Sequence, residues 1–160
     1  MAPRFTASHA ELDGAAVERA ACDAATAPVG ATVTFKGIVR GANQGRRVVR
    51  LEYEGYETMI ARVFARIAEE IDAHWPGTSS AIHHRLGTLR PGDVSVVIVT
   101  ASAHRAAAYA ANRYAIERVK QIAPVWKHEH FEDGDVWVEG AVAGEDDEAA
   151  RLKALEIACA

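Results

Sequence analysis

The sequence predicts an α+β fold in which two main helices pack on a mixed or antiparallel sheet, with an extra small subdomain of strands. Residues 57–75 carry apolar side chains at the i, i+3, i+4 and i+7 spacing of an amphipathic helix. Residues 94–100 form an almost continuous β-branched run, which is typical of a strand buried on both faces. Strands that alternate with long helices in a chain of 160 residues favour one layered domain.

The N-terminal part of the chain is expected to contain a short helix and a strand. Residues 10–25 are rich in alanine and place apolar residues near helical spacing, until Pro28 and Gly30 end the segment. Residues 31–39 are dominated by β-branched side chains, which predicts a strand, and Gly37 marks an irregularity within it.

A loop, a second strand and the long helix follow. Residues 41–47 have the glycine and asparagine content of a mobile loop. They lead to a strand over residues 48–56, which is expected to pair with the first strand as a hairpin. The helix over residues 57–75 is then stopped by Pro76.

The second half of the chain predicts four strands and another helix. Residues 81–86 are expected to form a strand and residues 89–93 a turn, after which residues 94–100 form the central strand. Ser102 is predicted to cap a helix that ends near Ile122, before a proline.

The C-terminal part of the sequence predicts two short strands and a tail. The strands are expected over residues 125–131 and 136–138, on either side of an acidic turn. We divide the chain into a single domain over residues 1–145 and a tail over residues 146–160. The tail is acidic at first and then has the composition of a helix.

Charge and composition exclude several classes of protein. Eighteen basic against twenty-two acidic side chains give a net charge of −4, which offers no general attraction to nucleic acid or to an anionic membrane. No apolar run approaches the roughly 18 residues that a membrane span needs, and no secretory signal is recognisable, so a cytoplasmic protein is expected. Cys22 and Cys159 lack the spacing of a zinc site, a redox motif or a disulfide framework.

The start of the second helix is a candidate anion site. Free backbone N–H groups and the helix dipole favour negative charge there, and His104 and Arg105 stand beside them. Phosphate is the natural ligand of such a site. Alternatively, His104 only helps to cap the helix and Arg105 is only solvated.

Lys120 and Lys127 are the second group of interest. Because Pro124 ends the helix between them, the chain turns and can bring both ammonium groups to one pocket. Two such cations depress each other's pKa, which favours a neutral amine, or they bind a multiply charged anion. The alternative is that both lysines are simply solvated, with Trp126 in the core.

The distance along the helix separates the two candidate groups. His104 and Lys120 lie sixteen positions apart, which corresponds to about 24 Å at a rise of about 1.5 Å per residue. Either they serve different sites, or a two-fold dimer brings the helix start of one subunit near the helix end of the other.

The paired histidines are weak metal candidates. Neighbours in a strand point to opposite faces, so His83 and His84 do not chelate together, whereas His128 and His130 would share a face. No third ligand stands at a recognisable spacing, and we therefore predict no metal site.

Several segments together resemble the large, catalytic subunit of molybdopterin synthase in order and spacing. They are TFKGIVR at 34–40, HRLG at 84–87, PGD at 91–93, SAHR at 102–105 and KQIAPVWKHE at 120–129. The resemblance runs from about Gly30 to Glu139, and the first 25 and last 20 residues match weakly.

The resemblance implies an α/β hammerhead fold and an enzyme of molybdenum cofactor biosynthesis. Members convert cyclic pyranopterin monophosphate into molybdopterin by installing two sulfurs as a dithiolene. The sulfur arrives as a thiocarboxylate on the C-terminal Gly-Gly of a small ubiquitin-like subunit. Two large subunits form the homodimer core of a heterotetramer. Neither a metal nor another cofactor is expected.

The resemblance also assigns site residues by position. Lys120 and Lys127 are implied as the catalytic lysines. The implied substrate-binding residues are Ile38, Val39, Arg40, His104, Arg105, Lys120, Lys127, His128 and Glu129.

The sequence also departs from the family. Ile38 stands where many members carry a basic residue, and Ala141 stands where some carry an arginine. One anion contact is therefore either missing or supplied by Arg46 or Arg47.

Three other functions compete with the enzyme. The main alternative is a non-catalytic module that binds phosphate or pterin. The second is an interaction protein that docks through its tail, and the third, disfavoured by the charge, is a nucleic-acid-binding protein.

Overall fold

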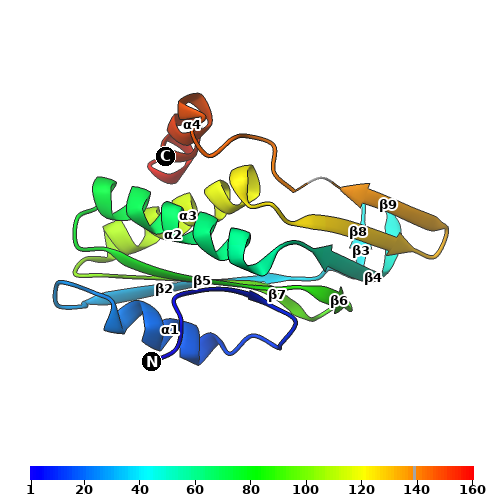
Figure 1. Ribbon diagram of the computed structural model, residues 1–160, viewed down its shortest axis with the longest axis horizontal. Helices are drawn as coiled ribbons and strands as arrows, with labels where there is room; N and C mark the ends of the chain where they lie inside the picture. Colours follow the sequence, from blue (N-terminus) through cyan, green and yellow to red (C-terminus); the bar gives the residue numbers. More distant parts are fainter. Residues whose placement is uncertain (139) are drawn as a thin grey trace.

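The computed structural model describes residues 1–138 and 140–160, in an α+β architecture with two sheets (Figure 1). The elements are β1 (Phe5–Ser8), α1 (Gly14–Asp23), β2 (Ala31–Ile38), β3 (Ala42–Asn43), β4 (Arg46–Glu54), α2 (Glu57–His74), β5 (Ser79–Arg85), β6 (Gly87–Leu89), β7 (Val94–Ser102), α3 (Arg105–Ile122), β8 (Trp126–Phe131), β9 (Gly134–Val138) and α4 (Glu148–Ala158). Within these residues, no helix is long and apolar enough to cross a membrane.

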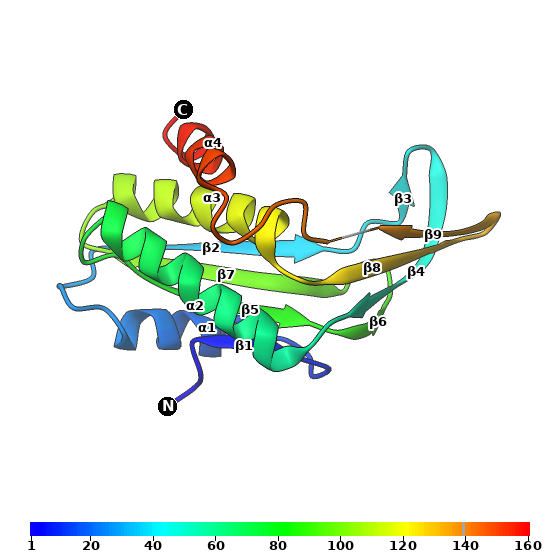
Figure 2. The ribbon, with the colours of Figure 1, turned by 45° about the horizontal axis from the view of Figure 1, so that its top comes forward.

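The first sheet has the strand order β1-β5-β7-β2 and is mixed, because β1 pairs with β5 in parallel while the other pairs are antiparallel. Helix α1 covers one face and helices α2 and α3 cover the other (Figure 2). Strand β7 is therefore buried on both faces, and its predicted central position is confirmed. The main core contains Ile60 and Phe64 of α2, Tyr114 of α3 and Ile98 of β7.

The second sheet has the order β3-β4-β8-β9, with β6 paired to β4, and forms the small strand subdomain at one end of the molecule (Figure 1). Its own core consists of Val39, Val48, Leu51, Leu89 and Phe131. In β8 the side chains alternate between the two faces of the sheet, as the strand period requires. This subdomain meets the first sheet beside the end of α3, and the candidate site lies at that junction.

The predicted hairpin between the first two long strands is wrong. Strand β2 pairs with β7, for example Phe35 with Ile98, whereas β4 pairs with β8. The predicted loop is instead a tight β3–β4 hairpin, whose turn residues Gln44 and Gly45 have φ angles of 51° and 75°. Positive φ at both turn positions matches the twist of a two-residue hairpin, so β4 finds its hairpin partner in β3 and leaves β2 free for β7.

The predicted helix cap is also wrong. Ser102 is the last residue of β7, and its hydroxyl accepts a hydrogen bond from Thr78 Oγ1 at 3.0 Å. The helix begins three residues later, at Arg105, with His104 at the N-cap position and no side-chain capping bond. Strand β7 continues past the β-branched run, because Ser102 still pairs with Ala31 of β2.

The C-terminal tail contains a helix, as its composition predicts. Asp147 caps α4 by accepting a hydrogen bond from Ala150 N at 3.0 Å. Ala154 is fully buried against the main core, and Gln121 of α3 donates to Ala150 O at 2.9 Å. Helix α4 therefore packs on α3, where both views place it (Figures 1 and 2).

Candidate functional site

A pocket of about 160 Å³ lies at the junction of the two sheets, beside the last turns of α3. Its polar lining consists of Arg40, Asn43, Tyr53, Ser95, Lys120, Lys127 and Glu129. Its remaining walls are Phe35, Gly37, Ile38, Val39, Val48, Leu51, Val96 and Ile116. Three cations and one carboxylate therefore face a small hollow with an apolar floor.

Two different elements bring the lysines to this pocket. Lys120 lies four residues after Ile116 on α3, and residues at this spacing share a helix face. The helix ends at Ile122, and Pro124 starts the turn into β8. Lys127, the second residue of β8, then points back into the same pocket. The predicted meeting of both ammonium groups in one pocket is confirmed.

A chain of polar contacts links Lys127 to Arg40. Lys127 Nζ lies 2.6 Å from Glu129 Oε1, and Asn43 Nδ2 donates to Glu129 Oε2 at 3.0 Å. Arg40 Nη2 in turn donates to Asn43 Oδ1 at 3.5 Å. Because Glu129 is buried, its carboxylate holds Lys127 and the β3 hairpin in fixed positions.

The protonation of the site follows from burial and from its neighbours. Burial lowers the pKa of Lys120, and the charge of Lys127 lowers it further. Burial alone would raise the pKa of Glu129, but hydrogen bonds from Lys127 and Asn43 and the charges of Lys127 and Arg40 lower it overall. The pocket thus contains an ionised carboxylate and an amine that loses its proton more readily than an exposed lysine.

A second, more apolar hollow of about 240 Å³ adjoins the first and shares Tyr53, Lys120 and Lys127 with it. Its other lining residues are His84, Val119, Ala123, Val125, Val138, Gly140 and Val142. A Cβ at Gly140 would overlap the carbonyl oxygen of Val125, so only glycine fits at this close approach. The two lysines therefore stand between a polar pocket and an apolar one.

His84 is a buried lining residue of the apolar hollow. Its ring packs edge-on against Tyr53 with the centroids 4.9 Å apart, and its Nδ1 lies 2.8 Å from Arg85 O. Burial lowers the pKa of His84 to about 4, and the charge of Lys120 contributes to this shift. His84 is therefore a neutral, buried side chain at neutral pH.

The pocket gathers six of the residues that the sequence singled out. They are Ile38, Val39, Arg40, Lys120, Lys127 and Glu129. His104 and Arg105 lie at the opposite end of α3 and do not line it. His128 lies between Lys127 and Glu129 on β8 and contacts Glu52 and Asp135 instead, on the other face of the strand.

The two arginines considered as substitute anion contacts lie elsewhere. Arg46 pairs with Asp133 at 2.9 Å and stacks over Phe131, and Arg47 pairs with Glu132 at 3.3 Å. Neither lines the lysine pocket. Glu139, the last residue of the resembling stretch, lies outside the described residues.

Sequence reasoning missed Asn43, Tyr53, Ser95 and Ile116 as pocket residues. Asn43 was not predicted because residues 41–47 have the composition of a mobile loop. The helical spacing of Ile116 and Lys120 and the strand alternation of Leu51 and Tyr53 are the signals that could have identified two of them.

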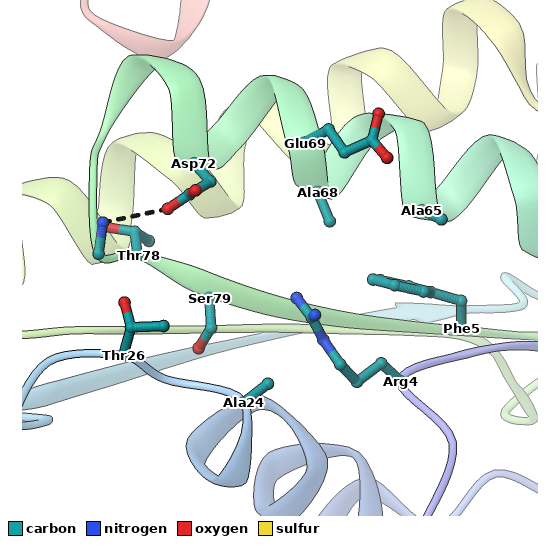
Figure 3. Close-up of a pocket in the computed structure, with 11 residues that line it drawn as sticks. Arg4, Phe5, Ala24, Thr26, Ala65, Ala68, Glu69, Asp72, Thr78 and Ser79 are labelled. Carbon is teal, nitrogen blue, oxygen red and sulfur yellow. Dashed lines mark hydrogen bonds between the residues drawn. The ribbon is translucent and has the colours of Figure 1, made fainter.

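A third hollow, of about 270 Å³, lies away from the lysines, between α2 and the ends of α1 and β5. Figure 3 shows Arg4 extending into it between Asp72 and Glu69 on one side and Ala24 and Thr26 on the other. Arg4 Nε is already bonded to Ser80 O at 3.1 Å. None of the residues singled out from the sequence lines this hollow, and we take the lysine pocket as the candidate site.

The comparisons with known proteins identify the family of the chain. The family described as MoaE protein matches residues 7–122. The molybdopterin synthase catalytic subunit of Bacillus subtilis is 54% identical over 109 residues, which cover 68% of this chain and 69% of that protein. The chain belongs to the MoaE family of molybdopterin synthase catalytic subunits. The MoaE relative in Staphylococcus epidermidis strain RP62A is 49% identical over 125 residues, which cover 78% of this chain and 83% of that protein.

Solved structures share the MoaE fold. Molybdopterin synthase from Staphylococcus aureus matches with a TM-score of 0.79 and 39% identity, covering 85% of this chain and 97% of that one. A complex of subunits 1 and 2 of molybdopterin-converting factor from Helicobacter pylori matches with a TM-score of 0.69. At 21% identity, over 92% of this chain and 99% of that one, it supports the fold alone. The resemblance and the hammerhead-type α+β class predicted from the sequence are confirmed.

Proposed function

We propose that this MoaE-family chain converts cyclic pyranopterin monophosphate into molybdopterin, with sulfur from the C-terminal thiocarboxylate of a small partner subunit. The observation that carries the proposal is the position of Lys120 and Lys127 between a polar pocket and an apolar one. The polar pocket offers Arg40 and both ammonium groups to a phosphorylated pterin. The apolar hollow, with Gly140 at its narrow wall, suits an extended Gly-Gly terminus.

The proposed reaction uses both pockets together. The thiocarboxylate sulfur forms a bond to a side-chain carbon of the substrate while the bond from that carbon to oxygen breaks, giving a thioester and an alkoxide or phosphate oxygen. Water then cleaves the thioester, returning the partner terminus as a carboxylate and leaving a thiolate on the substrate, with two protons released. A second charged partner repeats the transfer to complete the dithiolene.

The lysines serve different parts of this reaction. A neutral amine accepts one of the two protons that hydrolysis releases, and the other goes to the displaced oxygen or to water. Because its pKa is lowered, Lys120 is neutral more often than an exposed lysine, and we assign this role to it. Lys127, held by Glu129 at 2.6 Å, presents a fixed positive charge to the oxygen that develops negative charge. Arg40 holds the phosphate beside them.

His104 and Arg105 enter the proposal through a dimer. They lie at the start of α3, far from the lysines of the same chain, and a two-fold axis would supply them from a second copy. Strand β9 supports such an interface, because Val136, Trp137 and Val138 are exposed on an edge strand. We propose this homodimer as the core of a heterotetramer with one small subunit at each end.

Reconstitution tests the proposal. The chain is mixed with cyclic pyranopterin monophosphate and a thiocarboxylated small subunit, and the dithiolene product is followed by mass spectrometry. Lys120→Ala and Lys127→Ala should each abolish product, whereas Lys153→Ala, which changes an exposed lysine on α4, should not. Substrate binding without product in the wild type would favour the non-catalytic pterin-binding module. Full activity of Lys120→Ala would remove that lysine from the mechanism.

A further inference from the structure

We propose that Glu52, His128 and His130 form a binding site for a divalent transition-metal ion of the zinc type. One ligand atom from each of the three side chains lies within 4.8 Å of those of the other two. The site is on the face of the second sheet opposite the lysine pocket, and it stands on its own geometry, independently of the proposed sulfur transfer.

The strand register creates this cluster. Glu52 of β4 pairs directly with His128 of β8, and His130 lies two residues further along β8 on the same face. The flanking residues Leu51 and Glu129 point the other way, into the lysine pocket. Two histidines and a carboxylate from adjacent strands thus meet on one surface, although Glu52 lies 78 positions before His130 in the sequence.

The distances fit coordination without movement of the backbone. Glu52 Oε2 lies 3.5 Å from His128 Nδ1 and 3.0 Å from His130 Nε2. Bonds of about 2.0–2.2 Å in tetrahedral geometry place neighbouring ligand atoms roughly 3.4 Å apart. All three ligand atoms lie within 4.8 Å of one another, so we expect small side-chain rotations to bring them around one ion, with a water molecule as the fourth ligand.

The surrounding residues hold the ligands in orientations suited to a metal. His128 Nε2 lies 2.6 Å from Asp135 Oδ2, so an N–H on Nε2 donates to Asp135 and leaves Nδ1 free to face Glu52. A carboxylate behind a ligating histidine fixes its tautomer and raises its basicity. Trp137 stacks on the His128 ring at 4.1 Å, and Arg50 Nε lies 3.5 Å from the other oxygen of Glu52.

The cluster is also accessible to an ion. The side chains of His128, His130 and Glu52 are 14%, 18% and 32% exposed, which shelters them without closing them off. The centroids of the two histidine rings lie 4.0 Å apart, so both rings reach the same small space beside Glu52. Imidazole and carboxylate ligands suit zinc better than calcium or magnesium.

A bound ion would join β4 to β8 at the wall of the lysine pocket. Its ligands alternate along the strands with Tyr53 and Lys127, which line that pocket from the other face. The expected consequence is a more stable subdomain with a more rigid pocket wall, because an ion that binds only the folded chain stabilises it.

Zinc titration of the full-length chain tests the site. After dialysis against a chelator, Zn²⁺ is added in competition with a chromophoric chelator, and the unfolding temperature is recorded with and without the ion. We expect one ion per chain and a rise in unfolding temperature. His128→Gln, His130→Gln and Glu52→Gln should weaken binding at least about 100-fold and remove the rise, and Asp135→Asn should weaken it by about 10-fold.

Two controls make the result specific. His9→Gln removes a histidine that also lies beside a carboxylate, Glu57 at 3.5 Å, but outside the cluster, and it should leave binding unchanged. Cys159→Ser removes an exposed thiol and should likewise leave it unchanged. Absence of binding by the wild type would overturn the site, as would binding that persists in Glu52→Gln or disappears only in Cys159→Ser. Circular dichroism of each metal-free variant checks its fold, and Glu52→Gln, which keeps both histidines, provides the mildest substitution.

Discussion

Lys127 and Glu129 stand two residues apart on β8, face the same pocket and form an ion pair of 2.6 Å between Nζ and Oε1. The second oxygen of Glu129 is bonded to Asn43, so the carboxylate has little freedom to move. A lysine side chain has a flexible stem, and this pair is what fixes its ammonium group in the pocket.

Glu129→Gln should therefore lower kcat by about 10- to 100-fold, since a small displacement of a reacting group has an effect of this size. Glutamine keeps the shape of the side chain but no longer carries the charge that holds Lys127. The reconstituted reaction measures this. Glu132→Gln is the matched control. Glu132 lies in the same β8–β9 hairpin as Glu129, but it pairs with Arg47 outside the pocket. An unchanged kcat in Glu129→Gln would show that Lys127 is positioned by something else.

The pKa of Lys120 should rise when Lys127 loses its charge. Burial is the larger cause of the lowered pKa of Lys120 and the charge of Lys127 is the second, so Lys127→Met should remove only part of the shift. Nuclear magnetic resonance of the lysine side chains, followed from neutral to alkaline pH, measures the change. Lys153→Met on α4 should leave the titration of Lys120 where it is. A fall in the Lys120 pKa in Lys127→Met would contradict the assignment.

His84 should make the folded state less stable in acid. Its pKa is about 4 in the folded chain, against about 6.5 when unfolded, so the unfolded chain binds more protons between these values. The free energy of unfolding should therefore be unaffected by His84 above about pH 6.5. It should fall by about 3 kcal/mol in total as the pH is lowered towards 4, because protonation of His84 favours the unfolded chain. Urea unfolding of the wild type and of His84→Gln across this pH range measures how steeply the free energy of unfolding depends on pH in each protein. We expect the steeper dependence in the wild type. Parallel pH profiles would mean that His84 is not held neutral by the fold.

The periodic elements could be predicted from sequence and the pairing of strands could not. The helix pattern of residues 57–75 and the β-branched run of residues 94–100 report local burial, and α2 and β7 appear where these patterns lie. Which strand pairs with which depends on contacts between distant segments, such as Phe35 with Ile98, and on the Gln44-Gly45 turn that redirects the chain. Strand β1 is only four residues long and leaves too little pattern to detect.

Some of the functional residues could be predicted from the sequence, and others could not. Basic residues beside a helix-ending proline identified Lys120 and Lys127, because charge and chain direction are both readable in the sequence. Glu52 could not be associated with His128 and His130, since only the β4–β8 register places them together. His104 and Arg105 remain far from the pocket within one chain, and the dimer that would bring them there stays a prediction.

The buried ion pair of Arg118 and Glu70 links α3 to α2. Arg118 is fully buried, and its Nε and Nη2 each lie 2.8 Å from a different oxygen of Glu70. Tyr114 OH donates to Glu70 at 2.7 Å, and Arg118 Nη2 also donates to Glu145 O at 3.3 Å, just before α4. The pair thus joins both long helices to the segment that leads into α4.

Removing one partner of this pair leaves the other charge buried without compensation. Glu70→Gln and Arg118→Met should each lower the free energy of unfolding by about 3–5 kcal/mol, measured by urea denaturation. Arg113→Ala breaks an exposed ion pair with Glu117 on the same helix and should cost no more than about 1 kcal/mol. The double variant Glu70→Leu/Arg118→Met should lose less than the sum of the two single losses, because neither charge then remains buried alone. Additive losses would show that the two side chains act separately, with packing rather than charge joining α2 to α3.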